Sequence, residues 1–210
     1  MMNRREILRY VAYTTGAAVS APFASAFLLA CDTDTATAAE VAAPPYEPKF
    51  FSREQYDFIT KVADTIIPRT DTPGASDVGV PEVIDRMVGD VYGEEIQAHS
   101  KLGLDALRAK LDADNAATEG GFMALDDAAA LTYLQGVDAA YKDPELDWSQ
   151  ATEEEQILMG TYFELKQMVI AHYFGSEEVA TTQLAYDPIP GGYIPCGDLQ
   201  ELSGGKAWAI

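Results

Sequence analysis

Apolar residues recur every three or four positions in five segments of the chain, and this spacing predicts amphipathic helices. Ser52 and Gln55 form a capping box at the start of the first segment, and Thr152 and Glu155 form another at the start of the last. No segment shows the alternating pattern of a strand. The predicted helices cover residues 52–67, 81–91, 94–111, 126–141 and 152–173. The sequence therefore predicts an all-α domain, a single bundle of five or six helices around one core.

The segment that follows the last predicted helix breaks this pattern. Residues 186–197 are dense in proline and glycine, which excludes a helix or a central strand. They nevertheless carry aromatic and aliphatic side chains, which need a surface to pack against. That surface is either the bundle itself or a partner protein, so we expect an irregular C-terminal segment with a contact role.

The N-terminus has the pattern of an export signal. Arg4 and Arg5 open a short polar stretch, and a moderately apolar run rich in small residues follows at 10–30. An arginine pair followed by Ile-Leu-Arg is typical of the twin-arginine route, which exports folded proteins. A transmembrane helix is the alternative, but Pro22 and the small residues of the run disfavour it.

Residues 28–31 read Leu-Leu-Ala-Cys and resemble a lipobox, in which Cys31 would carry a lipid anchor. Alternatively, Cys31 is an ordinary thiol near a cleavage site. We therefore expect a signal peptide at 1–31, a flexible tether at 32–48 that is poor in large apolar residues, and the helical domain at 49–210. The expected location is the periplasm, with anchoring to the inner membrane.

Composition excludes several classes of protein. The net charge of −20 would repel nucleic-acid phosphates, so no nucleic-acid partner is expected. The chain has two cysteines, Cys31 and Cys196, which are too few for a disulfide scaffold or a cysteine-held iron–sulfur cluster. No haem-attachment signature is present.

The search for catalytic chemistry yields no convincing site. The two histidines, His99 and His172, have no partner at metal-ligand spacing and no adjacent nucleophile in a favourable register. Four acidic residues follow the first helix: Asp71, Asp77, Glu82 and Asp85. They lack the spacing of a calcium loop, so a solvated loop is the better interpretation. The sequence thus predicts no catalytic, cofactor-binding or metal-binding residue and favours a binding subunit over an enzyme.

Several segments resemble the gluconate 2-dehydrogenase subunit 3 family. The most specific is the run from Ile66 to Ala75, which reads Ile-Ile-Pro-Arg-Thr-Asp-Thr-Pro-Gly-Ala. The other matching segments are Phe50 and Phe51 with Gln55, residues 163–166, Tyr173 and Phe174 with Ser176, residues 184–186, residues 190–193, and Cys196. The resemblance spans roughly residues 50–197 and departs from the family at His172, where a small residue is more usual.

The resemblance implies a small, non-catalytic subunit of a membrane-associated, FAD-dependent sugar or sugar-acid dehydrogenase. The catalytic partner would be a glucose–methanol–choline type oxidoreductase that binds FAD, and a c-type cytochrome would be a further partner. This chain would then serve export, maturation as a chaperone, and membrane anchoring. The alternative is a stand-alone periplasmic lipoprotein that binds or acts on sugars.

The partner-binding surface is expected where apolar residues occur in segments without regular structure. Two such segments are the loop after the first helix and the C-terminal segment, and the end of the last long helix lies between them in sequence. The candidate residues are Thr70, Asp71, Pro73, Gly74, Tyr173, Phe174, Tyr186, Pro190, Gly191 and Tyr193.

Overall fold

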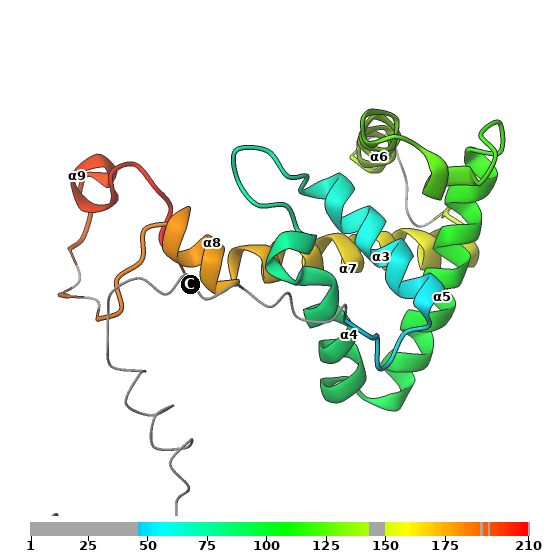
Figure 1. The fold of residues 1–210 in the computed structure, drawn as a ribbon, viewed down its shortest axis with the longest axis horizontal. Helices are drawn as coiled ribbons and strands as arrows, with labels where there is room; N and C mark the ends of the chain where they lie inside the picture. Colours follow the sequence, from blue (N-terminus) through cyan, green and yellow to red (C-terminus); the bar gives the residue numbers. More distant parts are fainter. Residues whose placement is uncertain (1–45, 143–149, 190, 193, 210) are drawn as a thin grey trace, which may run out of the picture. The chain divides into compact units, whose positions relative to one another are not determined.

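A computed structural model describes residues 46–142, 150–189, 191–192 and 194–209. Within them the chain forms seven α-helices and two short 3₁₀ helices, and one isolated bridge pairs Ala185 with Trp208 (Figure 1). The helices are α3 (Arg53–Ile66), η2 (Ser76–Val78), α4 (Val80–Val91), α5 (Glu94–Asp114), η3 (Gly121–Ala124), α6 (Asp127–Tyr141), α7 (Glu153–Phe174), α8 (Glu177–Thr182) and α9 (Leu199–Ser203). The predicted all-α class is confirmed. The expected signal peptide, with Arg4, Arg5 and Cys31, lies outside the described residues.

The five long helices agree with the five periodic segments of the sequence. Both predicted capping boxes are present, since Ser52 and Thr152 each accept a hydrogen bond from the backbone three residues later. Helix α5 extends to Asp114, three residues beyond its predicted end. Helices α8 and α9 were not predicted, because six and five residues are too few for a helical period to register.

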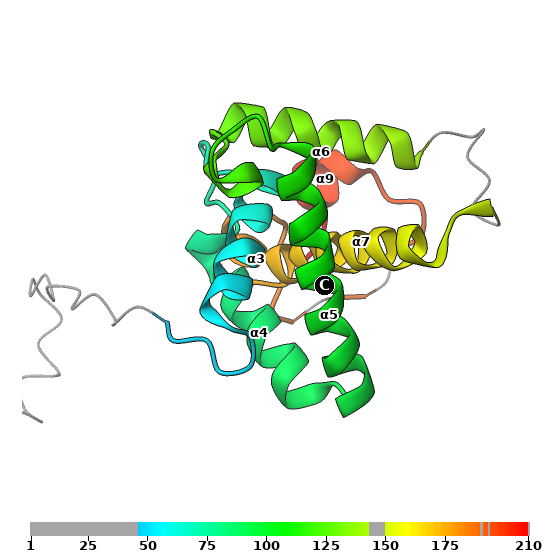
Figure 2. The same cartoon turned by 90° about the vertical axis from the view of Figure 1, so that its right-hand side faces the viewer.

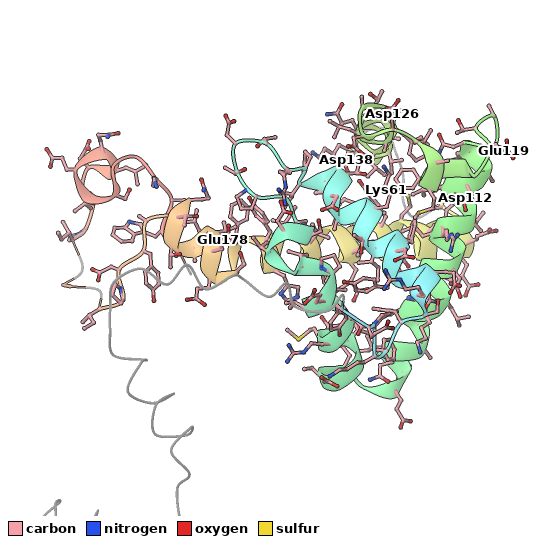
Figure 3. All side chains as sticks on the ribbon, in the orientation of Figure 1. Lys61, Asp112, Glu119, Asp126, Asp138 and Glu178 are labelled. Atoms are coloured by element: carbon pink, nitrogen blue, oxygen red, sulfur yellow. The ribbon has the colours of Figure 1, made fainter. Side chains whose placement is uncertain are left out.

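Helix α7 is the centre of the bundle and contacts α3, α4 and α5, while α6 packs on α3. Figures 1 and 2 both show α5 crossing α7. The core is built from Phe58, Ile59 and Val62 of α3, Ile84 and Val88 of α4, Leu104, Leu107 and Leu111 of α5, and Leu158, Tyr162, Leu165, Val169 and Tyr173 of α7. Charged side chains surround this core (Figure 3).

The crossing of α5 and α7 depends on a glycine. A Cβ atom added to Gly103 would lie 2.3 Å from Thr161 Oγ1 and 3.2 Å from its Cγ2. The Thr161 hydroxyl donates a hydrogen bond to the carbonyl of Ile157 at 2.9 Å, which holds it in this position. The two helices can therefore approach this closely only because position 103 carries no side chain.

Asp85 corrects the expectation of a solvated acidic loop. Its side chain is buried on α4 and accepts hydrogen bonds from Tyr46 Oη at 2.8 Å and from the backbone nitrogens of Lys49, Phe50 and Phe51 at 2.8, 3.1 and 2.8 Å. This carboxylate ties the segment before α3 to α4, and the tie includes Tyr46, which the sequence places in the tether.

The hydrogen bonds to Asp85 keep its carboxylate ionised. Burial by itself would raise the pKa of Asp85, but the hydrogen bonds from Phe51, Lys49, Tyr46 and Phe50 outweigh it, so the pKa is lowered. Burial and the hydrogen bond to Asp85 together raise the pKa of Tyr46 to about 12, so the phenol remains a donor. The interaction is therefore a carboxylate held by neutral donors rather than an ion pair.

Replacing Gly103 tests the helix crossing. Gly103→Ala should lower the free energy of unfolding by about 1 kcal/mol, because overpacking costs about 1–3 kcal/mol and alanine's higher helix propensity offsets only about 1. The control variants are Gly136→Ala and Gly160→Ala, where an added Cβ meets no atom within 4 Å. Urea denaturation should show that these two are unchanged or stabilised; equal stability of all three would contradict the close crossing.

Replacing Asp85 tests the N-terminal anchor. Asp85→Asn should lower the free energy of unfolding by about 2–4 kcal/mol at pH 7, because the amide presents its NH₂ group to buried donors. Since the folded-state pKa of Asp85 lies below the unfolded value of about 3.9, its contribution is complete above that pH and disappears as pH falls through the folded pKa.

The gap in unfolding free energy between wild type and Asp85→Asn should therefore narrow below about pH 4. Asp90→Asn is the matched control, because Asp90 is exposed on the same helix. A pH-independent gap, or an equal loss in the Asp90 variant, would show that the charge of Asp85 is not the anchor.

Candidate functional site

The structure brings two of the expected partner-binding segments together at the C-terminal end of α7. The Tyr173 hydroxyl donates a hydrogen bond to the carbonyl of Pro73 at 2.9 Å, although the residues are 100 positions apart. The rings of Tyr173 and Phe174 stack edge to face, with centroids 5.3 Å apart. Figure 1 shows the loop between α3 and α4 on this side of the bundle, near α8. Tyr186 follows α8 and begins the C-terminal segment.

The loop at residues 67–77 is closed by its own hydrogen bonds. The Ala75 nitrogen donates to the Ile67 carbonyl at 2.9 Å, and the Gly74 nitrogen donates to Asp77 Oδ2 at 2.8 Å. A Cβ atom at Gly74 would lie 2.8 Å from the Arg69 nitrogen, so the turn requires glycine there. Arg69 pairs with Asp77, and its guanidinium lowers the pKa of that carboxyl. The loop is therefore closed by contacts within the chain.

Exposure divides the candidate residues into two groups. Tyr173 is 6% exposed and Gly74 is buried, so their contacts lie within the chain. Phe174 is 41% exposed and Tyr186 is 55% exposed. The residues that face solvent are Thr70, Asp71, Phe174, Tyr186 and Gly191, and Pro73 is half-buried. Pro190 and Tyr193 lie outside the described residues.

Sequence reasoning missed further exposed apolar residues in the same region. We call residues 183–209 the C-terminal arm. Its exposed large apolar side chains, besides Tyr186, are Ile189, Ile194, Leu199, Leu202 and Trp208. The sequence indicated that the proline- and glycine-rich part of the arm needed a packing surface. It gave no signal that the bundle leaves these side chains uncovered.

The side chains considered for chemistry do not converge. Burial lowers the pKa of His172, which keeps the ring neutral at pH 7. His99 lines an open groove of about 480 Å³ between α5 and α7, together with Leu102, Glu153 and Ile157. Across the described ranges, no group of three or more histidine, cysteine or acidic residues is arranged to hold a metal ion. Nor is any helix in this part of the chain long and apolar enough to cross a membrane.

The fold defines the class of an all-helical protein, here with a closed loop fastened to the end of α7. Comparison with protein families gives the particular family: the model for gluconate 2-dehydrogenase subunit 3 matches residues 53–191. The chain belongs to this family, as its sequence resemblance predicted, and by the family's name it is a subunit of a dehydrogenase complex. A search of curated proteins found no match, and neither did a search of solved structures.

The match begins at the first residue of α3 and ends within the C-terminal arm. It therefore includes the closed loop, the end of α7 and Tyr186, but it omits residues 194–209. The run of residues 66–75, on which the sequence resemblance chiefly rests, coincides with the loop that Tyr173 fastens. In this chain the run forms a closed loop, since Gly74 and Tyr173 are needed for its geometry.

Removing the Tyr173 hydroxyl tests the fastening of the loop. Tyr173→Phe should cost about 1 kcal/mol of unfolding free energy and leave the Pro73 carbonyl without its donor. Hydrogen–deuterium exchange should then become faster in a peptide that contains Ala75. Phe174→Leu is the control and should leave the exchange unchanged, because the Phe174 ring carries no hydrogen-bonding group. Equal protection in wild type and Tyr173→Phe would contradict the fastening role.

Proposed function

We propose that this chain is the small, non-catalytic subunit of a periplasmic, FAD-dependent dehydrogenase that oxidises a sugar or sugar acid. In this role it carries the catalytic subunit through export, assists its maturation and holds it at the membrane. The observation that carries the proposal is the family match over residues 53–191, which makes the chain a subunit of a dehydrogenase complex.

The N-terminal sequence supports the export part of the proposal. The Arg4–Arg5 pair directs a route for folded cargo. A subunit exported by this route can bring along a folded companion that already holds its flavin. The companion then needs no signal peptide of its own, because the signal peptide of this chain would direct the export of both proteins. The c-type cytochrome is the further partner that would accept electrons from the flavin.

The anchoring part rests on Cys31 and on the connection that follows it. A lipid on Cys31 would attach the tether to the inner membrane. The tether joins the folded domain at Tyr46, whose hydroxyl is bound by Asp85.

The contact region supports a binding role for the domain. Phe174 exposes aromatic surface next to Tyr173, which is bonded to the closed loop, and Tyr186 exposes more in the arm; aromatic residues are enriched at protein interfaces. A preformed surface binds with less entropic cost than a flexible one. FAD binding and sugar oxidation are assigned to the catalytic companion, and recognition is assigned to this chain.

Changing the arginine pair tests the export role. Arg4→Lys with Arg5→Lys should abolish periplasmic sugar-dehydrogenase activity and leave the flavin-containing companion in the cytoplasm, because the route reads the arginine pair. Arg9→Lys is the matched control, since Arg9 lies in the same polar stretch but outside the pair. The measurement is flavin absorbance and dye-linked sugar oxidation in separated cell fractions.

A second variant separates anchoring from export. Cys31→Ser should leave export intact and move the activity from the membrane fraction to the soluble periplasm. If the companion reaches the periplasm without this chain, the export role is wrong. Sugar oxidation by the purified, flavin-free chain would instead indicate a stand-alone enzyme.

A further inference from the structure

We propose that the C-terminal arm, residues 183–209, is the element that docks the dehydrogenase subunit. This inference rests on the proposed function and assigns it to a defined surface. The arm follows α8 and contains α9, and Figure 1 shows it beyond the end of α7, away from the packed α3–α5 layer.

The first observation is an unusual density of exposed apolar side chains. Half of the large hydrophobic residues that are exposed in the described part of the chain belong to the arm. Ile189 is 84% exposed, which is the highest value among them. The six residues of the arm are Tyr186, Ile189, Ile194, Leu199, Leu202 and Trp208.

The arm exposes aromatic as well as aliphatic surface. Tyr186 and Trp208 are the two aromatic residues among the six, and an aromatic side chain buries about 150–250 Å² when it is fully covered. Phe174, at the end of α7, adds further aromatic surface. A concentration of exposed apolar side chains in one short stretch of chain favours an interaction site.

The second observation is that the arm is closed on itself. The Ala185 nitrogen donates to the Ala207 carbonyl at 2.8 Å, and the Ala209 nitrogen donates to the Ala185 carbonyl at 2.9 Å. Lys206 Nζ donates to the carbonyl of Thr182 at 3.3 Å, which joins the returning segment to α8. The arm is therefore a closed loop whose two ends are hydrogen-bonded together.

The turn before this closure is also built into the sequence. Gly204 and Gly205 both have positive φ angles, 65° and 82°, which other residues rarely adopt. They end α9 and direct the chain back toward Ala185. Asp198 caps the start of α9 by accepting a hydrogen bond from the Glu201 nitrogen at 3.1 Å. A loop held in this way loses less conformational entropy on binding than a free tail.

Packing inside the arm supports a defined shape. A Cβ atom at Gly197 would lie 2.5 Å from Leu202 Cδ1 and 3.3 Å from Ile194 Cγ2. Ile194 and Leu202 therefore both lie against Gly197, although both remain more than one third exposed. A partner that covers these two side chains would complete the burial that the arm cannot achieve alone.

Charge indicates a protein surface rather than a lipid surface as the occupant. The charged residues described in the arm are Asp187, Asp198, Glu201 and Lys206, so acidic groups predominate. Glu178 on α8 adds an acidic side chain near the base of the arm (Figure 3). Anionic lipids attract clusters of basic residues, which the arm lacks. An apolar patch with an acidic rim fits an apolar protein surface that carries basic residues at its edge.

The test uses the full-length chain produced together with its dehydrogenase subunit, with the affinity tag on the dehydrogenase subunit. Ile189→Asp and Tyr186→Ala should each reduce the affinity of the complex by about tenfold or more, as expected for residues at the centre of an interface. Both side chains are exposed, so the thermal unfolding of the variants should match wild type. Leu102→Asp is the matched control, because Leu102 is 71% exposed but lies on α5.

Each outcome is decisive. Loss of the complex in the two arm variants, with Leu102→Asp unchanged, supports the arm as the docking element. Normal complex formation by both arm variants overturns it and leaves the proposed function intact. If wild type itself fails to form a complex with the dehydrogenase subunit, the proposed function fails as well. Arm variants that keep the complex but lose binding to phosphatidylcholine–phosphatidylglycerol vesicles would make the arm a membrane contact and would also overturn the proposal.

Discussion

The buried stripe of α7 is the constraint on which the rest of the structure depends. Its side chains at Leu158, Tyr162, Leu165, Val169 and Tyr173 follow helical spacing and are all buried, each contributing about 1.5–3 kcal/mol by the area it removes from water. Because the stripe runs from Leu158 to Tyr173 along the 22-residue helix α7, three other helices are needed to cover it. The last residue of the stripe, Tyr173, then places the loop after α3 through its hydroxyl.

The same constraint explains which features the sequence could predict. Periodicity and capping boxes act within one helix, so all five long helices were predicted from local pattern. The burial of Asp85 could not be predicted in this way, because an acidic residue near a helix start is usually solvated. The four hydrogen-bond donors to Asp85 lie 34 to 39 positions earlier in the chain. The contact of Gly103 with Thr161 is likewise a property of two distant segments. Long-range pairings of this kind leave no periodic signal.

The sequence placed part of the candidate surface at the loop after the first helix, and the structure shows a different role for several residues of that loop. The loop at residues 70–80 suggested a partner contact because it combines apolar residues with an irregular backbone. In the folded chain, Gly74 and Tyr173 are engaged in closing and fastening the loop, so much of this pattern reflects its internal geometry. The exposed aromatic residue Phe174 follows Tyr173 directly at the end of α7. A sequence motif can thus occur at a candidate surface because it determines the backbone conformation there. The neighbouring exposed side chains are then the candidates for contact with a partner.

The acidic net charge of the chain is compatible with an exposed apolar arm in a subunit that, under the proposed function, exists before it binds its companion. Two copies of a chain with a net charge of −20 repel each other, which opposes association through the exposed arms. The repulsion is screened beyond about 8 Å at physiological ionic strength, so it weakens encounters between copies without preventing contact with a partner of complementary charge. A dehydrogenase subunit with basic residues around an apolar surface would be attracted where a second copy is repelled. In the proposed complex, charge would favour the partner over a second copy at short range, and the apolar side chains of the closed arm would stabilise the complex on contact.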